Sequence, residues 1–401
     1  MKLTVGIDWA KEEHAVCVLD AQGTVKARLT VPHTKEGLGA LCRRLTKFAE
    51  SAELEIALER PSGLLADTVV AAGFTLVPIH PNVVKASRPR YSTVSAKDDR
   101  GDAYLLADLL RTDGHRFRPL KPLSDEVRAL RTLVRTRTDL VAKRVALTNQ
   151  LRSSLEDYWA GAAVIFCTLD SPIALAFIER YPTPQHTRRL GEKRMAGFLS
   201  KNRYTGGRSP AELLKRLHAA PLGEAGELET EAKAQAVLAY VSAVRAIAAG
   251  IRRLTSLIEL EVLRLPTGKV VASFPSAGKV NAGQILAEIG DDPSRFQTEA
   301  QLAAEAGVVP VTHASGKSRG VNFRRACNKR LRFAITTWAN NSRRTSPWAQ
   351  DTYERARARG CNHPHAIRIV SRAWIRVLWR CWRNGQPYDL EQHAGALRFA
   401  A

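Results

Sequence analysis

The sequence has little acid for its amount of base, and it lacks the cysteine pairs of disulfide-stapled or zinc-ribbon domains. Its 401 residues include 61 Lys and Arg against 39 Asp and Glu, a formal net charge of +22. The six cysteines are scattered without a CxxC pair, so we expect reduced cytosolic thiols. No uninterrupted apolar run suggests a membrane-spanning helix, and the N-terminus is typical of a strand, not of a signal peptide. The excess base predicts a polyanionic partner, usually nucleic acid.

Motifs for nucleotides and metals are incomplete. "SAGKV" has Val280 where Ser or Thr should hold magnesium, and "SGKS" has Val311 where the first glycine of a P-loop belongs. "GIDWA" is similar to the first phosphate loop of actin-like ATPases and sugar kinases, but Ala10 replaces the required glycine. "CNHPH", which begins at Cys361, lacks a second pair of metal ligands. The kinase hypothesis stays open only as an alternative, which nucleotide binding would test.

The first third alternates apolar runs with helical spacing. Alternating or apolar runs predict strands at residues 2–8, 14–20, 24–31, 54–59 and 74–80. Helical spacing predicts helices at residues 34–50, 62–73 and 97–111. Three meandering strands followed by alternating helices and strands favour an α/β sheet with ligands at its strand ends.

The second third is predicted to be helical. After Ser124, a good N-cap with acids in the first turn, residues 127–159 contain no Gly or Pro. Leucines recur every seven residues there, and a second long helix is expected at about residues 227–265, broken only by Gly250. We expect these two helices to pack as an antiparallel coiled coil, with short helices between them at about residues 160–223.

The last third holds most of the excess charge. Between Ser315 and Arg383 there are seventeen Lys and Arg residues and two acids. Five tryptophans are interleaved with the arginines, and we expect most of them to be core residues. The arginines predict a basic surface for nucleic acid. The chain therefore divides at residues 1–118, 119–265 and 266–401.

Four acids point to a metal site. Asp8 ends an apolar strand and Glu59 closes another, which is costly unless each acid is solvated, paired or bound to a cation. In "AKDDRGDAYLLAD", helical spacing leaves two candidate pairs, Asp98 with Asp102 and Asp99 with Asp102. If that helix packs over both strand ends, four carboxylates converge, as in a two-metal site for phosphoryl transfer. The pattern favours an RNase H-like nuclease or transposase core.

Several separated motifs together resemble one family, and the resemblance spans nearly the whole chain. They are "GIDWAKEEHAVCVLD", "ALERPSG", "AKDDRGDAYLLAD", "SFPSAGKVNAGQILAEIGD", "FQTEAQLAAEAGVVPVTHASGKSRG" and "CNKRLRFAITTWA". The family is that of the DEDD-type insertion-sequence transposases with a RuvC-like N-terminal domain, insertion-sequence family one-ten. The resemblance implies Mg²⁺, two ions with Mn²⁺ as a substitute, held by Asp8, Glu59, Asp99 and Asp102. The D-x-x-D-A register selects Asp99, so Asp98 becomes an acid at the helix N-terminus.

The resemblance also implies a catalytic serine in a C-terminal transposase domain. It corresponds to Ser315 in "HASGKSRG", a stretch whose small, polar and basic residues predict a loop, with Ser318 as the second candidate. The implied mechanism is attack on a DNA phosphodiester to give a transient DNA–serine link, followed by strand exchange. His313 is the only nearby candidate base, so metal ions would have to activate the serine.

Phosphate contacts are expected around this loop, and one departure from the family lies further upstream. The expected contacts are His313, Lys317, Arg319, Arg324, Arg325, Lys329 and Arg330. Where the family often has P-G-x-G, residues 275–278 read PSAG and keep one glycine. Asp108, nearly two turns beyond Asp102, is expected to be solvated or salt-bridged.

The sequence therefore predicts an RNA-guided transposase or site-specific recombinase of an insertion element. The implied partners are donor and target DNA, a structured non-coding guide RNA and further copies of the chain, from dimer to tetramer. We expect a prokaryotic cytoplasmic protein at the nucleoid, without membrane contact. The alternatives are a metal-dependent Holliday-junction-type resolvase or nuclease without a covalent intermediate, and a nucleic-acid-binding protein with a decayed site, which four retained acids disfavour. Transposase and domesticated invertase both stay open.

Overall fold

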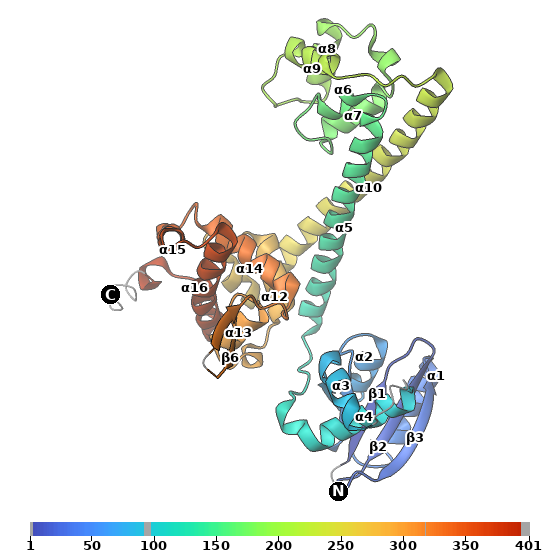
Figure 1. Cartoon of the computed structure of the whole chain (residues 1–401), viewed down its shortest axis with the longest axis vertical. Helices are drawn as coiled ribbons and strands as arrows, with labels where there is room; N and C mark the ends of the chain where they lie inside the picture. The colour runs from blue at the N-terminus through green and yellow to red at the C-terminus, as the bar shows by residue number, and fades with distance from the viewer. Residues whose placement is uncertain (1–2, 92–97, 317, 394–401) are drawn as a thin grey trace. The chain divides into compact units, whose positions relative to one another are not determined.

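A five-stranded mixed sheet forms the centre of the first of two units, Met1–Pro122 (Figure 1). The structure is a computed structural model that describes residues 3–91, 98–316 and 318–393. The strand order is β3-β2-β1-β4-β5, with antiparallel pairing from β1 to β3 and parallel pairing of β1, β4 and β5. The strands are β1 (Thr4–Asp8), β2 (Glu13–Leu19), β3 (Val25–Pro32), β4 (Glu55–Leu58) and β5 (Thr75–Pro78). All five lie where the sequence predicts strands.

Helices cover both faces of this sheet, so the first unit is a mixed α/β structure. The helices are α1 (Lys35–Leu45), α2 (Leu64–Ala71), α3 (Pro81–Ser87) and α4 (Asp99–Asp113). Val5 and Ile7, the odd-numbered residues of β1, join the core with α1 and α2. The opposite face, which includes Cys17 and Ala57, packs against α4. This alternation follows from the two-residue period of a strand.

Two long helices run antiparallel in the second unit, Leu123–Ala401, as Figure 1 shows. They are α5 (Asp125–Glu156) and α10 (Glu227–Arg264). Arg137 of α5 donates to Thr255 of α10 at 2.8 Å. The expected break at Gly250 is absent: α10 continues through it, because a glycine weakens a helix by only about 1 kcal/mol and Gly250 lies against Leu140.

The burial pattern of α5 shows where this helical pair gains its stability. Its buried residues are Val127, Leu130 and Val134 near one end and Leu151 and Leu155 near the other, and none lies between. At one end the pair packs with α6 (Ala160–Val164), α7 (Pro172–Arg180), α8 (Glu192–Lys201) and α9 (Pro210–Ala219). Contacts with further helices at its ends, more than contacts with α10 alone, therefore keep water away from α5.

The helices after α10 form a second core at the other end of the pair. They are α11 (Pro266–Ala272), α12 (Lys279–Ile289), α13 (Glu299–Glu305), α14 (Lys329–Ser342), α15 (Pro347–Ala358) and α16 (His363–Asn384). Trp338, Trp374 and Trp382 are at most 1% exposed, whereas Trp348 and Trp379 are half-buried. The expectation that most tryptophans are core residues is confirmed.

A two-stranded hairpin stands between α13 and α14, where the sequence predicted a loop. It consists of β6 (Val311–Ser315) and β7 (Ser318–Asn322). Every described residue of the two strands is exposed except half-buried Val311. Strand prediction failed here because the residues are small, polar and basic, without the β-branched alternation that marks half-buried strands.

Among the residues that the structure describes, one helix, α10, is long and apolar enough to cross a membrane by length and composition alone, with 28% of its most apolar window buried. The core helix of a soluble protein passes the same test, so this is weak evidence for a membrane span. The expectation of no spanning helix relied on uninterrupted apolar runs, and Arg245 interrupts this stretch.

Candidate active site

Asp8 and Glu59 lie at the carboxyl ends of neighbouring parallel strands. β1 and β4 pair in register up to Ile7 opposite Leu58, and each acid is the next residue. Adjacent strands are about 4.8 Å apart. The residues that follow the acids stay together as well, because the guanidinium carbon of Arg60 lies 4.3 Å from the ring centre of Trp9. Both acids are half-buried, as expected for strand-end carboxylates.

Helix α4 can approach β1 closely because Gly6 has no side chain. A Cβ at Gly6 would lie 2.0 Å from the carbonyl oxygen of Ala103 and 2.4 Å from the amide nitrogen of Ala107. Since side chains alternate along a strand, Asp8 shares the face of Gly6. The helix that carries Asp99 and Asp102 therefore packs on the same face of β1 as Asp8.

The four aspartates at positions 98, 99, 102 and 108, in α4 and at its N-cap, have different surroundings. Asp98 is the N-cap and accepts a hydrogen bond from the amide of Arg100 at 3.2 Å, and Asp99 is exposed in the first turn. Asp102 is 8% exposed and Asp108 is 5% exposed. The expectation that Asp108 is salt-bridged or solvated resolves to an ion pair: Arg111 lies 2.6 Å from its carboxylate.

Arg88 holds the carboxylate of Asp102. The two side chains form an ion pair at 2.7 Å. Three residues after Arg88, the Tyr91 hydroxyl donates a 2.7 Å hydrogen bond to Asp108, which also belongs to α4. Burial, then the hydrogen bond and the charge of Asp108, raise the pKa of Tyr91. Tyr91 is therefore a neutral donor. The segment after α3 is thus fastened to α4 at two points.

No coordination shell is formed by the side chains that the structure describes: no three His, Cys, Asp or Glu residues lie close enough to hold a metal ion. The donor set still suits magnesium, which uses one or two carboxylates plus waters and substrate phosphates. Asp8 and Glu59 supply such a pair. The assignment of all four acids to metal stays a prediction, and it requires Asp102 to exchange Arg88 for a cation.

Ser315 is the last residue of β6 and is exposed. It lies directly opposite Ser318 in the hairpin, so the two hydroxyl groups occupy one cross-strand pair. His313, two residues earlier, shares the face of Ser315, while Arg319 pairs with Ala314 on the other face. The hairpin therefore presents the two serines and the histidine together, and neither serine is distinguished by burial.

The predicted phosphate contacts fall into three groups. His313 and Arg319 are exposed on the hairpin, and Lys317 lies outside the described residues. Arg324 is half-buried and donates to the carbonyl of Val309 at 3.3 Å. Arg325 and Lys329 are exposed, and Arg330 forms an exposed ion pair with Asp139 at 3.0 Å. The exposed members can reach a polyanion at little cost.

Sequence reasoning missed Gly6, Arg88 and the Trp9–Arg60 contact. A glycine inside a strand signals close backbone approach, so "TVGID" carried a usable sign for Gly6. No comparable sign in the sequence marks Arg88, because its partner Asp102 is fourteen residues away, in a segment of different periodicity.

Comparisons with known proteins agree over nearly the whole chain. Residues 5–160 match a family described as transposase, of the DEDD type of IS110. Residues 268–354 match one described as transposases of the IS116/IS110/IS902 family. The chain is 30% identical over 398 residues to the mini-circle putative transposase for IS117 of Streptomyces coelicolor, covering 98% of this chain and 96% of that protein.

Two further relatives are proteins of insertion elements. The IS900 uncharacterized 42 kDa protein of Mycobacterium paratuberculosis is 29% identical and the match covers 96% of each chain. The IS110 uncharacterized 43.6 kDa protein of Streptomyces coelicolor is 28% identical, with 98% of this chain and 96% of the relative covered.

Proposed function

Because the chain belongs to the IS110 family of transposases, and is therefore an enzyme that acts on DNA, we propose that it cleaves and exchanges DNA strands through a serine–DNA intermediate, with the help of magnesium. The observation that best supports the metal part is the parallel register of β1 and β4, which leaves Asp8 and Glu59 side by side. The serine part is supported by the exposure of Ser315 in a basic hairpin.

The sheet order in the N-terminal unit supports an RNase H-like, RuvC-like assignment for that unit. In such a sheet, ligands gather outside the carboxyl ends of parallel strands, which is where Asp8 and Glu59 stand. We keep the three-part division of the chain at residues 1–118, 119–265 and 266–401 as part of this proposal, with α5 and α10 as an antiparallel coiled coil.

DEDD-type transposase domains generally use divalent metal ions. We assign Mg²⁺, two ions that Mn²⁺ can replace, to Asp8, Glu59, Asp99 and Asp102. When bound, the ions would activate the attacking hydroxyl and stabilise the leaving oxygen. Asp8 and Glu59 are set by their strands, whereas Asp102 becomes available once Arg88 turns to another anion. A DNA phosphate is such an anion, so substrate binding and metal binding would support each other.

Ser315 is assigned as the nucleophile. Its hydroxyl would attack a DNA phosphorus, forming an Oγ–P bond while the 3′ or 5′ oxygen of the cleaved strand leaves with a proton. Reversal of this step by a second strand would release the serine. His313, on the same face of the hairpin, and Arg319, Arg325 and Lys329 nearby in the chain would hold phosphates. Arg324, Arg330 and Lys317 complete the proposed contacts.

The wider partners follow from the same assignment. We propose donor and target DNA, a structured non-coding guide RNA, and assembly of two to four copies in a prokaryotic cytoplasm near the nucleoid. The charge supports the nucleic-acid partners, because seventeen of the 61 Lys and Arg residues fall between Ser315 and Arg383 against two acids. RNA guidance is tested by sequencing RNA that copurifies with the protein.

The deciding experiment compares two serines of one cross-strand pair. Full-length protein with its copurifying RNA is incubated with Mg²⁺ and element-end DNA labelled on either strand, and adducts are resolved on denaturing gels. We expect a covalent adduct that Ser315→Ala abolishes and that Ser318→Ala retains, with strand transfer by Ser315→Ala reduced about 10³-fold or more.

Other results of this experiment would contradict one part of the proposed mechanism. Full adduct formation by Ser315→Ala contradicts the covalent role of that residue. Cleavage by the unchanged protein without any adduct favours a metal-dependent resolvase. Asp8→Asn and Asp102→Asn should lose cleavage while binding DNA within about threefold of the unchanged protein, since exposed cations supply most of the affinity.

A further inference from the structure

A cavity of about 500 Å³ lies at the base of the β6–β7 hairpin, at the opposite end from Ser315. It is lined by residues 307–310 before β6, by residues 321–324 at the end of β7, and by one face of α16. The α16 residues, His365, Arg368, Ile369 and Arg372, recur at helical spacing. A volume of this size falls within the range of about 300–1,000 Å³ for ligand pockets. We call this space the hairpin-base cavity.

The charge of the hairpin-base cavity is positive. Arg324, Arg368 and Arg372 line it, and no Asp or Glu does. Arg372 is held by Glu299, with its guanidinium 3.4 Å from the carboxylate. Arg368 has neither an ion pair nor a hydrogen bond with any other residue in the described ranges. Burial, then the charge of Arg332, lowers the pKa of Arg368. An incoming anion would relieve this like-charge contact.

Phe323 gives the cavity a flat apolar surface. The residue is 46% exposed, and leaving so much apolar surface in water is costly. The guanidinium carbons of Arg332 and Arg368 lie 4.5 and 4.9 Å from its ring centre. An aromatic ring beside unneutralised guanidinium groups is the combination that binds single-stranded nucleic acid, by stacking of the base and attraction of its phosphate.

We propose that the hairpin-base cavity holds one unpaired nucleotide of the DNA substrate, with the base against Phe323 and Ile369 and the phosphate on Arg368 and Arg324. The inference rests on the proposed function, which brings DNA to this hairpin. A base in a duplex exposes only its edges, so it must leave the stack to enter a pocket.

The distance of the cavity from Ser315 indicates what a bound nucleotide would do. Four residue steps separate the base of the hairpin from its tip, or about 14 Å at about 3.4 Å per residue, which matches about four steps of a DNA strand at about 3.4 Å each. A nucleotide seated at the base would fix which phosphate reaches Ser315. The hairpin-base cavity would therefore set the cleavage register.

The test measures binding of the full-length protein to matched labelled duplexes. One is fully paired, one has a single extrahelical thymidine, one has an abasic residue in its place, and one is RNA with an extrahelical uridine. We expect about tenfold tighter binding of the extrahelical thymidine than of the paired duplex, and loss of most of this preference with the abasic residue.

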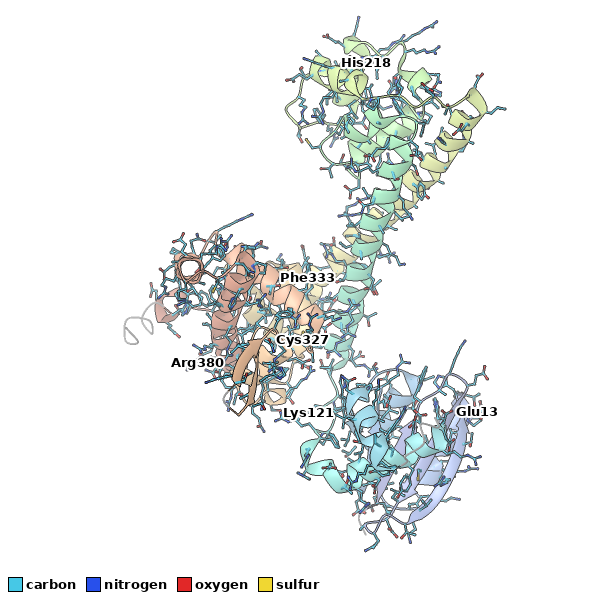
Figure 2. The ribbon with its side chains drawn as sticks, viewed as in Figure 1. Glu13, Lys121, His218, Cys327, Phe333 and Arg380 are labelled. Atoms are coloured by element: carbon cyan, nitrogen blue, oxygen red, sulfur yellow. The ribbon has the colours of Figure 1, made fainter. Side chains whose placement is uncertain are left out.

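Matched variants assign the preference to the cavity. Phe323→Ala and Arg368→Gln should remove the preference and leave paired-duplex affinity within about twofold. Phe333→Ala and Arg380→Gln should retain it, since these exposed residues lie on α14 and α16 outside the cavity lining (Figure 2). In the unchanged protein, 5-iodouracil at the extrahelical position should photo-cross-link to Phe323 or His365.

Four results would overturn the inference: no preference in the unchanged protein, a preference that survives Phe323→Ala, cross-links only outside the cavity, or tighter binding of the RNA bulge. The cross-link does not depend on a variant that folds. If these results occur while the Ser315-dependent adduct still forms, only the cavity assignment fails. If the protein binds none of the duplexes, the proposed function fails with it.

Discussion

The acids of the first unit and the serines of the second are held in opposite ways. Asp8 ends β1, whose other residues are buried, and Glu59 follows β4, in which only Glu55 is half-buried. Asp102 is 8% exposed on a helix packed against β1. Ser315 and Ser318 lie in a hairpin whose described residues are exposed apart from half-buried Val311. A two-stranded hairpin without a packed face is marginally stable in water.

This difference indicates a division of labour. Packing fixes the carboxylates of the first unit before any substrate binds. The proposed nucleophile, Ser315, is held only by a short ladder of backbone hydrogen bonds, so we expect DNA to supply much of the final geometry of the hairpin. We therefore expect changes in packing to be severe in the first unit and mild in the hairpin.

The largest expected contrast is between two glycines. Gly6→Ala places a Cβ 2.0 Å from backbone of α4, and we expect it to lower the free energy of unfolding of the first unit by about 3 kcal/mol. Gly320→Ala in β7 meets nothing within 4 Å and should change it by less than about 0.5 kcal/mol. Urea denaturation followed by circular dichroism measures both. Equal effects of the two changes would show that β1 is packed no more tightly than the hairpin.

The second unit also contains a firmly held carboxylate, in its helical core. Glu288 is 2% exposed and accepts hydrogen bonds from Arg135 at 2.9 and 3.0 Å and from Asn328, the N-cap of α14, at 2.9 Å. Glu288→Gln should destabilise this core by about 2 kcal/mol, because it weakens charge-assisted bonds. Asp139→Asn, which removes only the exposed pair with Arg330, should cost under about 0.5 kcal/mol.

The same carboxylate makes the core of the second unit sensitive to acid. Burial raises the pKa of Glu288, but hydrogen bonds from Arg135 and Asn328 and the charge of Arg135 outweigh it, so the net pKa is lowered. A lowered pKa in the folded state adds stability above the ordinary value of 4.5, and this is lost as the pH falls below it. Melting temperatures should therefore drop more steeply below about pH 4.5 for the unchanged protein than for Glu288→Gln. Parallel curves would contradict the assignment.

A smaller effect is expected where the second unit carries backbone strain. Ser276 has a φ of 54°, a left-handed conformation that favours glycine. Ser276→Gly should raise the free energy of unfolding by about 0.5 kcal/mol, although it loses the 2.8 Å hydrogen bond to Thr345. Ser276→Ala keeps the strain and loses the bond, so it should lower stability. Denaturant titrations of Ser276→Gly and Ser276→Ala show whether the backbone strain or the hydrogen bond to Thr345 has the larger effect on stability.

The smallest expected effect is on metal binding by the acids of the first unit. Arg88→Ala frees Asp102, so we expect Mn²⁺ to bind about two- to threefold more tightly by calorimetric titration, since a half-exposed ion pair is worth under about 1 kcal/mol. Arg90→Ala is the control, because Arg90 lies 4.0 Å from Asp113 instead. Weaker Mn²⁺ binding by Arg88→Ala would show that Arg88 positions Asp102 for the metal.

The sequence predicted the first unit better than the hairpin, for a physical reason. Strand alternation and strand-end acids are local patterns, so the sites of Asp8 and Glu59 could be inferred from neighbours in the chain. The ion pair between Arg88 and Asp102 joins two segments of different period, and no local pattern announces it. The family register selects Asp99 over Asp98, and the N-cap role of Asp98 agrees with it.

The second unit shows the converse. Long helical spacing predicted α5 and α10 well, but the hairpin has neither apolar alternation nor a buried face to predict it from. No local pattern predicts its cavity either, because Phe323 and Arg368 come from separate elements that only the fold brings together.

Gly6 has a consequence for mutational surveys of this enzyme. It carries no functional group, yet any larger residue there would push α4 away from β1 and displace Asp102 relative to Asp8. A saturation screen for transposition would rank Gly6 beside the acids as intolerant. Intolerance alone would thus misassign a spacer as a catalytic residue, and only a folding readout run in parallel would separate the two.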